Sequence, residues 1–201
     1  EWLWMGGDEL RPGMTTERIN ALVHEGIGDH GGIPSPLNYG NPPFPKSVCT
    51  SVNECVCHGI PSAKQVLRDG DIVNVDVTIY YPREYGFHGD TSATFYVGEP
   101  SEDAKRVVET ARWGLELGLR AVRDGARVRD IGRAIQDYAE AQGCSVVRDF
   151  VGHGVGREFH MPPQIPHYYE PRAGKRLKRG MTFTIEPMIN AGTWHDMLWP
   201  D

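Results

Sequence analysis

The chain has 201 residues, 39% hydrophobic and 24% charged, a composition typical of one globular domain spanning residues 1–201. A formal net charge of −6 gives no overall attraction to DNA or to an anionic membrane surface. No apolar run approaches the ~20 residues that cross a bilayer, and the four cysteines lack any C-x-x-C spacing, so we expect a cytoplasmic protein.

The predicted helices and strands fit two αβ halves, which indicates an α+β fold. Helices are expected over 16–25, with Thr15 or Thr16 as N-cap, from about 101 to just before Gly125, and over 129–142, where Gly143 follows the helix end. Strand signals cover 48–56, 71–80, 92–97, 145–147 and 181–189.

Three matched motifs in the same order indicate two related αβ halves. The matched pairs are 11–13 with 123–125, His58 with His153, and 67–76 with 177–186. In the last pair, Asp76 and Glu186 each follow a glycine by six residues. A carboxylate therefore falls at the same place in each half, and an ancient duplication explains the pattern.

Asp76 and Asp90 lie in a predicted β-hairpin, with 74–80 paired to 86–92. If the turn is centred on Arg83, Asp90 lies directly opposite Asp76, where two like charges would destabilise the strand pair. A bound cation would remove this repulsion. Alternation along 71–79 places the valines on one face and Asp76 on the other, polar face.

Three carboxylates and one imidazole, from Asp76, Asp90, Glu186 and His153, suggest a metal site. This donor set suits Mn²⁺, Fe²⁺, Co²⁺ or Zn²⁺, whereas calcium takes oxygen alone and structural zinc takes cysteine. Several carboxylates around one cleft indicate two ions. A structural charge network is the alternative for the group. His58 and His160 fit either a structural histidine or a site residue.

Basic residues are densest at Lys175, Arg176, Lys178 and Arg179. A solvated loop is the simpler interpretation of such a run, and contact with a polyanion such as ribosomal RNA is the alternative.

Five motifs together resemble type I methionine aminopeptidase, a pita-bread metallopeptidase, from about residue 10 onward. They are PKSVCTSVNECVCHGIP at 45–61, DIVNVDVT at 71–78, GFHGDTS at 86–92, GHGVG at 152–156 and MTFTIEPM at 181–188. The resemblance implies two pseudo-symmetric αβ halves around a two-metal cleft. It implies that the metal ligands are Asp76, Asp90, His153 and Glu186.

The resemblance also implies substrate contacts. His58 would lie near the scissile amide and amino terminus of the substrate, and His160 would contact its carbonyl oxygen. The walls of the methionine pocket would be Tyr39, Phe44, Cys49 and Phe159, where a thiol and aromatic faces suit a thioether. Ordinary core packing is the alternative for these four.

The implied activity is removal of the N-terminal methionine from nascent proteins and peptides by two-metal-assisted amide hydrolysis. The metals would be two divalent ions of cobalt, manganese, iron or zinc. His160 would stabilise the developing oxyanion and Glu186 would relay a proton to the leaving amine, so the catalytic residues would be His58, His160 and Glu186. The partners would be N-terminal methionine peptides and the ribosome. The enzyme would be a cytoplasmic monomer.

Two departures from the family affect this interpretation. The second bridging glutamate of the family would lie past Asp201, and residues 1–7 do not resemble its first helix. We therefore expect a domain incomplete at its C-terminus and also at its N-terminus, and weakly active or inactive by itself. The alternatives are a non-catalytic pita-bread binding module and a proline-directed peptidase of the same fold.

Overall fold

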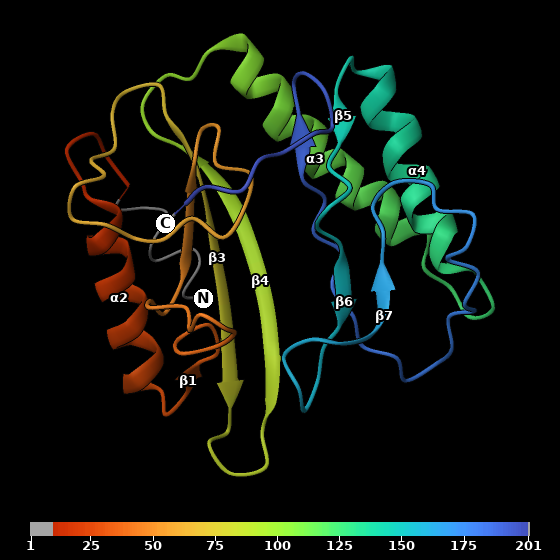
Figure 1. Ribbon diagram of the computed structural model, residues 1–201, viewed down its shortest axis with the longest axis horizontal. Helices are drawn as coiled ribbons and strands as arrows, with labels where there is room; N and C mark the ends of the chain where they lie inside the picture. Colours follow the sequence, from red (N-terminus) through yellow and green to blue (C-terminus); the bar gives the residue numbers. More distant parts are fainter. Residues whose placement is uncertain (1–9, 201) are drawn as a thin grey trace. The chain divides into compact units, whose positions relative to one another are not determined.

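The computed structural model describes residues 10–200, so the expectation for residues 1–7 lies outside it. The chain divides into two compact units. The first comprises the described residues up to Ser101 together with Gly156–Phe159, and the second comprises Glu102–Val155 and the described residues from His160 onward. Each unit contains helix and strand (Figure 1), as the α+β prediction requires. No helix within residues 10–200 is long and apolar enough to cross a membrane.

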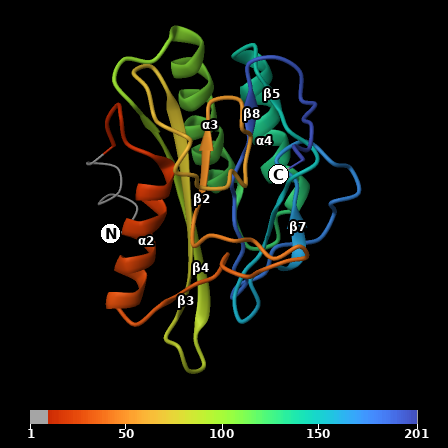
Figure 2. The ribbon, with the colours of Figure 1, turned by 60° about the vertical axis from the view of Figure 1, so that its left-hand side comes forward.

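The first unit is a four-stranded antiparallel sheet with one helix packed on it. Its elements are α2 (Thr16–Asp29), β1 (Ile33–Pro34), β2 (Cys49–Val52), β3 (Ile72–Tyr81) and β4 (Phe87–Tyr96). Strand β3 pairs with β4 along one edge and with β1 and β2 along the other. Figure 2 shows α2 running beside these strands.

The apolar face of β3 forms the core of the first unit with α2. Val73, Val75 and Val77 are at most 2% exposed, as the alternation predicted, and they share a cluster with Ile19 and Val23 of the helix. Helix α2 begins where the Thr15 hydroxyl accepts the Arg18 N–H at 3.3 Å, so Thr15 is the N-cap. Burial of one strand face leaves the other face for polar side chains.

The second unit contains two helices and two short strand pairs. Its elements are α3 (Glu102–Ala121), α4 (Val128–Ala141), β5 (Ser145–Val146), β6 (Gly152–Gly154), β7 (Met161–Ile165) and β8 (Ile189–Asn190). Helices α3 and α4 lie side by side (Figure 1), while β5 pairs with β8 and β6 with β7. The apolar face of α4 carries Val128, Ile131 and Ile135, each at most 1% exposed, into the core of this unit.

The two units repeat a local backbone arrangement, which confirms the match of 11–13 with 123–125 and the start of the match of 67–76 with 177–186. In the first, the Gly13 N–H donates to Leu67 O at 2.8 Å and the Leu67 N–H donates to Met14 O at 2.8 Å. In the second, the Gly125 N–H donates to Leu177 O at 2.9 Å, and the Leu177 N–H donates to the next carbonyl after Gly125 at 2.8 Å. The His58 match does not extend to conformation, because His58 lies in a loop at φ 57° whereas His153 lies in β6.

The strand expected over 181–189 is mostly irregular. Only Ile189–Asn190 forms a strand, and Phe183 makes a single antiparallel bridge to Gly154. Strand β7 has no clear sequence signal, because Pro162 and Pro163 cannot donate to a ladder and normally argue against a strand. The segment 181–189 of the second unit is therefore held by individual backbone hydrogen bonds more than by a long β-ladder.

Gly132 in α4 marks the tightest backbone approach in the second unit. A Cβ there would lie 2.1 Å from the carbonyl oxygen of Tyr168, so we expect Gly132→Ala to destabilise the fold by about 3 kcal/mol. Gly28 in α2 is the matched control, because a Cβ there meets nothing within 4 Å. Gly28→Ala should stabilise by roughly 1 kcal/mol through helix propensity. Urea unfolding of both variants checks this, and equal midpoints would refute the packing described for α4.

Candidate functional site

The two hairpin aspartates lie diagonally across β3 and β4. Asp76 pairs with Ser92, and Thr78 pairs with Asp90. The expectation that Asp90 faces Asp76 directly is therefore wrong, because the turn is centred on Glu84, one residue later than Arg83. Since cross-strand partners share a face, both carboxylates still project from the polar face of the sheet, as diagonal neighbours. Their repulsion is reduced but not removed.

Cys49 and His58 lie in the same polar region of the first unit. Cys49 pairs with Asp76 across β2 and β3, and it is 7% exposed. Burial raises the pKa of the Cys49 thiol, and the Asp76 carboxylate raises it further, so the thiol is neutral. Burial lowers the pKa of His58, and the Asp90 carboxylate opposes this shift. The first unit thus brings two carboxylates, a neutral thiol and a mainly neutral imidazole into one region.

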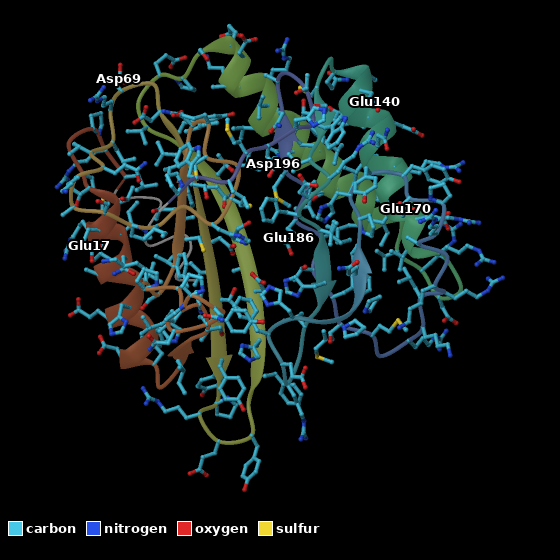
Figure 3. All side chains as sticks on the ribbon, viewed as in Figure 1. Glu17, Asp69, Glu140, Glu170, Glu186 and Asp196 are labelled. Carbon is cyan, nitrogen blue, oxygen red and sulfur yellow. The ribbon has the colours of Figure 1, made fainter. Side chains whose placement is uncertain are left out.

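His153 and Glu186 meet in the second unit. The Nε2 atom of His153 lies 3.5 Å from Oε1 of Glu186, and His153 is 8% exposed. Thr184 supports both residues: its hydroxyl donates to Oε1 of Glu186 and accepts the His153 N–H at 3.0 Å. The Thr184 N–H donates to His153 O at 2.8 Å. Figure 3 shows Glu186 beside β6.

The histidine tautomer is fixed by the backbone. Nδ1 of His153 lies 3.0 Å from the Gly154 carbonyl oxygen, which only accepts, so Nδ1 carries the hydrogen. Nε2 then presents its lone pair toward Glu186. Ligating histidines are typically held by such a bond from the other ring nitrogen. A lone pair and a carboxylate oxygen 3.5 Å apart can both ligate one divalent cation, so this pair fits the expected metal.

The His160 ring packs against the His153 ring in a tilted arrangement. Their ring centroids lie 4.1 Å apart at an interplanar angle of 46°. His160 is exposed, in contrast to His153. The exposed imidazole of His160 thus lies directly beside the buried one of His153.

His167 is a site residue that sequence reasoning missed. It is fully buried, and its Nε2 accepts the Glu186 N–H at 3.0 Å. Burial lowers the pKa of His167 to about 3, with a smaller contribution from His153, so the ring is neutral and can accept. The only sequence signal was the histidine itself, 19 residues before Glu186 and outside every motif.

We expect His167→Leu to destabilise the fold by about 1–3 kcal/mol, because the Glu186 N–H would be left buried without its acceptor. It should also lower metal affinity roughly 10- to 100-fold through displacement of Glu186. His167→Gln can still present an acceptor and should lie closer to the wild type in both respects. Urea unfolding and metal titration separate the two variants, and equal effects would contradict this role.

The expected pocket residues are partly brought together. Tyr39 and Phe159, both in the first unit, have ring centroids 4.9 Å apart at 52°. The Phe44 N–H donates to Tyr39 O at 2.8 Å, which ties their backbones. Cys49 lies beside the hairpin carboxylates instead, at its pairing position opposite Asp76. The first unit therefore contains an aromatic pair, and the Cys49 thiol lies buried next to Asp76.

His153 and Glu186 of the second unit form a candidate divalent-metal pair, and comparison with known proteins identifies the family. A model of metallopeptidase family M24 matches residues 4–199. The chain belongs to metallopeptidase family M24. The expected metallopeptidase class, with divalent metal ions as cofactors, is thereby confirmed.

The relatives are methionine aminopeptidases. Methionine aminopeptidase A of Synechocystis sp. is 54% identical over 192 residues, which cover 96% of this chain and 74% of that protein. Methionine aminopeptidase 1 of Saccharomyces cerevisiae is 49% identical over 202 residues, which cover 100% of this chain and 51% of that protein. The crystal structure of methionine aminopeptidase from Rickettsia prowazekii matches with a TM-score of 0.93 at 46% identity, over 99% of this chain and 78% of that one. These matches confirm the pita-bread fold prediction.

Proposed function

We propose that this protein removes the N-terminal methionine from peptides and nascent proteins. The observation that carries the proposal is identity of about half to named methionine aminopeptidases across nearly the whole chain. The local geometry supports it, because Nε2 of His153 lies 3.5 Å from Oε1 of Glu186. Because Nδ1 bonds to the Gly154 carbonyl, Nε2 carries the lone pair that can face a cation.

We infer that the ions are held by Asp76, Asp90, His153 and Glu186. Two divalent ions of cobalt, manganese, iron or zinc, once bound, would polarise the scissile carbonyl and make a water more acidic. Thr184 fixes the Glu186 carboxylate through its hydroxyl, and His167 fixes the Glu186 backbone. This support orients the carboxylate to receive and pass on a proton during amide hydrolysis.

The predicted site residues that are not metal ligands would contact the substrate. His160, exposed beside His153, would donate to the substrate carbonyl oxygen and stabilise the charge that develops there. His58, whose pKa is lowered by burial, would lie near the scissile amide and the free amino group. The methionine side chain would pack on Tyr39, Phe44, Cys49 and Phe159. Neutral Cys49 suits a thioether better than a thiolate would.

A peptide panel tests the proposed function. The full-length protein, loaded with Mn²⁺ or Co²⁺, should release methionine from Met-Gly and Met-Ala peptides, and more slowly from peptides with a large second residue. Leu-Ala and Xaa-Pro peptides are the controls for the side chain and for proline-directed cleavage. Absence of methionine release would overturn the proposal, and preferential Xaa-Pro cleavage would favour the proline-directed alternative.

We further propose that the protein works in the cytoplasm as a monomer and approaches its substrate at the ribosome. Lys175, Arg176, Lys178 and Arg179 are all exposed on one loop, although the net charge of the chain is −6. A local basic run of this kind suits a polyanion such as ribosomal RNA. Co-sedimentation with ribosomes should weaken with salt and with the paired change of Lys175→Glu and Arg179→Glu, but not with Lys64→Glu. Salt-independent co-sedimentation would contradict it.

A further inference from the structure

His88, at the start of β4, has no part in the chemistry proposed above. It pairs with Tyr80 across β3 and β4, and the two ring centroids lie 4.9 Å apart at 54°. Nδ1 of His88 lies 2.8 Å from the Ser35 hydroxyl oxygen. The Ser35 N–H in turn donates to the Thr78 carbonyl at 2.9 Å. The imidazole is therefore fixed to β3 through a cross-strand ring contact and through a serine that is itself bonded to that strand.

The other side of His88 meets the segment Gly156–Phe159, which packs within the first unit. The His88 N–H donates to Gly156 O at 2.7 Å. The His88 ring stacks on Phe159 with centroids 5.5 Å apart and an interplanar angle of only 12°. One residue thus contacts both ends of the segment, by its main chain at one end and by its ring at the other.

Phe159 carries this arrangement to Tyr39. Their centroids lie 4.9 Å apart, and Tyr39 is 45% exposed, so burial alone does not fix the tyrosine ring. The sequence of ring contacts runs from Tyr80 to His88, then to Phe159 and Tyr39. The far end of this row consists of two residues assigned above to the methionine pocket, and the near end is anchored in the sheet.

We propose that His88 is a positioning residue that holds Phe159, and through it Tyr39, as a wall for the substrate methionine side chain. The inference rests on the proposed function. The flat stack is the operative contact, and the Ser35 bond is an additional anchor for the imidazole.

The test is the steady-state kinetics of the full-length protein on a Met-Ala peptide. His88→Ala and His88→Asn both remove the ring, while the asparagine keeps a polar atom for Ser35. His88→Phe keeps the ring and loses that bond. We expect KM to rise roughly fivefold in His88→Ala and His88→Asn, the factor of an ordinary aromatic pair, with kcat within about twofold. His88→Phe should restore KM to near the wild-type value.

The outcomes distinguish this inference from the function on which it rests. A wild-type protein that releases no methionine overturns both. An active wild type with unchanged KM in His88→Ala overturns the positioning role alone. A fall in kcat at constant KM in all three variants also overturns it, because that pattern indicates a disturbed metal region. Recovery of KM by phenylalanine but not by asparagine supports it.

Discussion

Glu186→Gln is expected to lower methionine release by at least about 10³-fold, because it removes a charge that the ions need and the group that relays a proton. The fold should survive, since a glutamine side chain can still accept from the Thr184 hydroxyl, and the His167 bond uses only the backbone N–H. Steady-state rates at saturating metal, together with a thermal unfolding curve, measure both effects.

Glu140→Gln is the matched control for this change. Glu140 lies exposed on α4, and its carboxylate accepts from Gln136 at 2.6 Å, a bond that glutamine can keep. Figure 3 shows Glu140 on that helix, whereas Glu186 lies beside β6. The control should retain wild-type activity. Comparable losses in both variants, or a fully active Glu186→Gln protein, would show that Glu186 has no special role.

Asp90→Asn and Asp76→Asn are expected to change the number of bound ions in different ways. By the family resemblance Asp90 would hold both ions and Asp76 would hold one. Loss of Asp90 should therefore abolish tight binding of two ions, and loss of Asp76 should leave one ion tightly bound. The metal affinity of each affected site should fall by more than about 100-fold, which exceeds the effect of losing a residue that only supports a ligand. Elemental analysis of dialysed full-length protein gives the metal count for each variant.

Glu84→Gln provides the control in the same hairpin, because Glu84 is an exposed carboxylate at the centre of the turn. It should bind metal as the wild type does. Two tightly bound ions in Asp90→Asn would remove Asp90 from the ligand set.

Regular patterns in the sequence predicted the fold well where one strand face or one helix face is buried. The alternation of Val73, Val75 and Val77 fixed which side of β3 carries Asp76, and burial of these valines confirms it. The duplicated motifs predicted two related halves, and the matching backbone bonds to Leu67 and Leu177 agree with that prediction. Both signals are patterns of residue type along the chain, which a single sequence contains.

Features that depend on register or on distant contacts escaped prediction. A turn centred on Glu84 in place of Arg83 changed which residue faces Asp76. The role of His167 depends on one bond to the backbone of Glu186, and side-chain type alone does not reveal a backbone partner. The row of rings through His88 likewise depends on a segment returning from far along the chain.

The most direct test of the central claim is methionine release from a Met-Ala peptide by the full-length protein before and after metal removal. Protein stripped with a chelator and dialysed should be inactive, and added Mn²⁺ or Co²⁺ should restore release while leaving a Leu-Ala peptide intact. Persistent methionine release by fully stripped protein, or no release at any metal concentration, would contradict the assignment of this protein as a metal-dependent methionine-releasing enzyme.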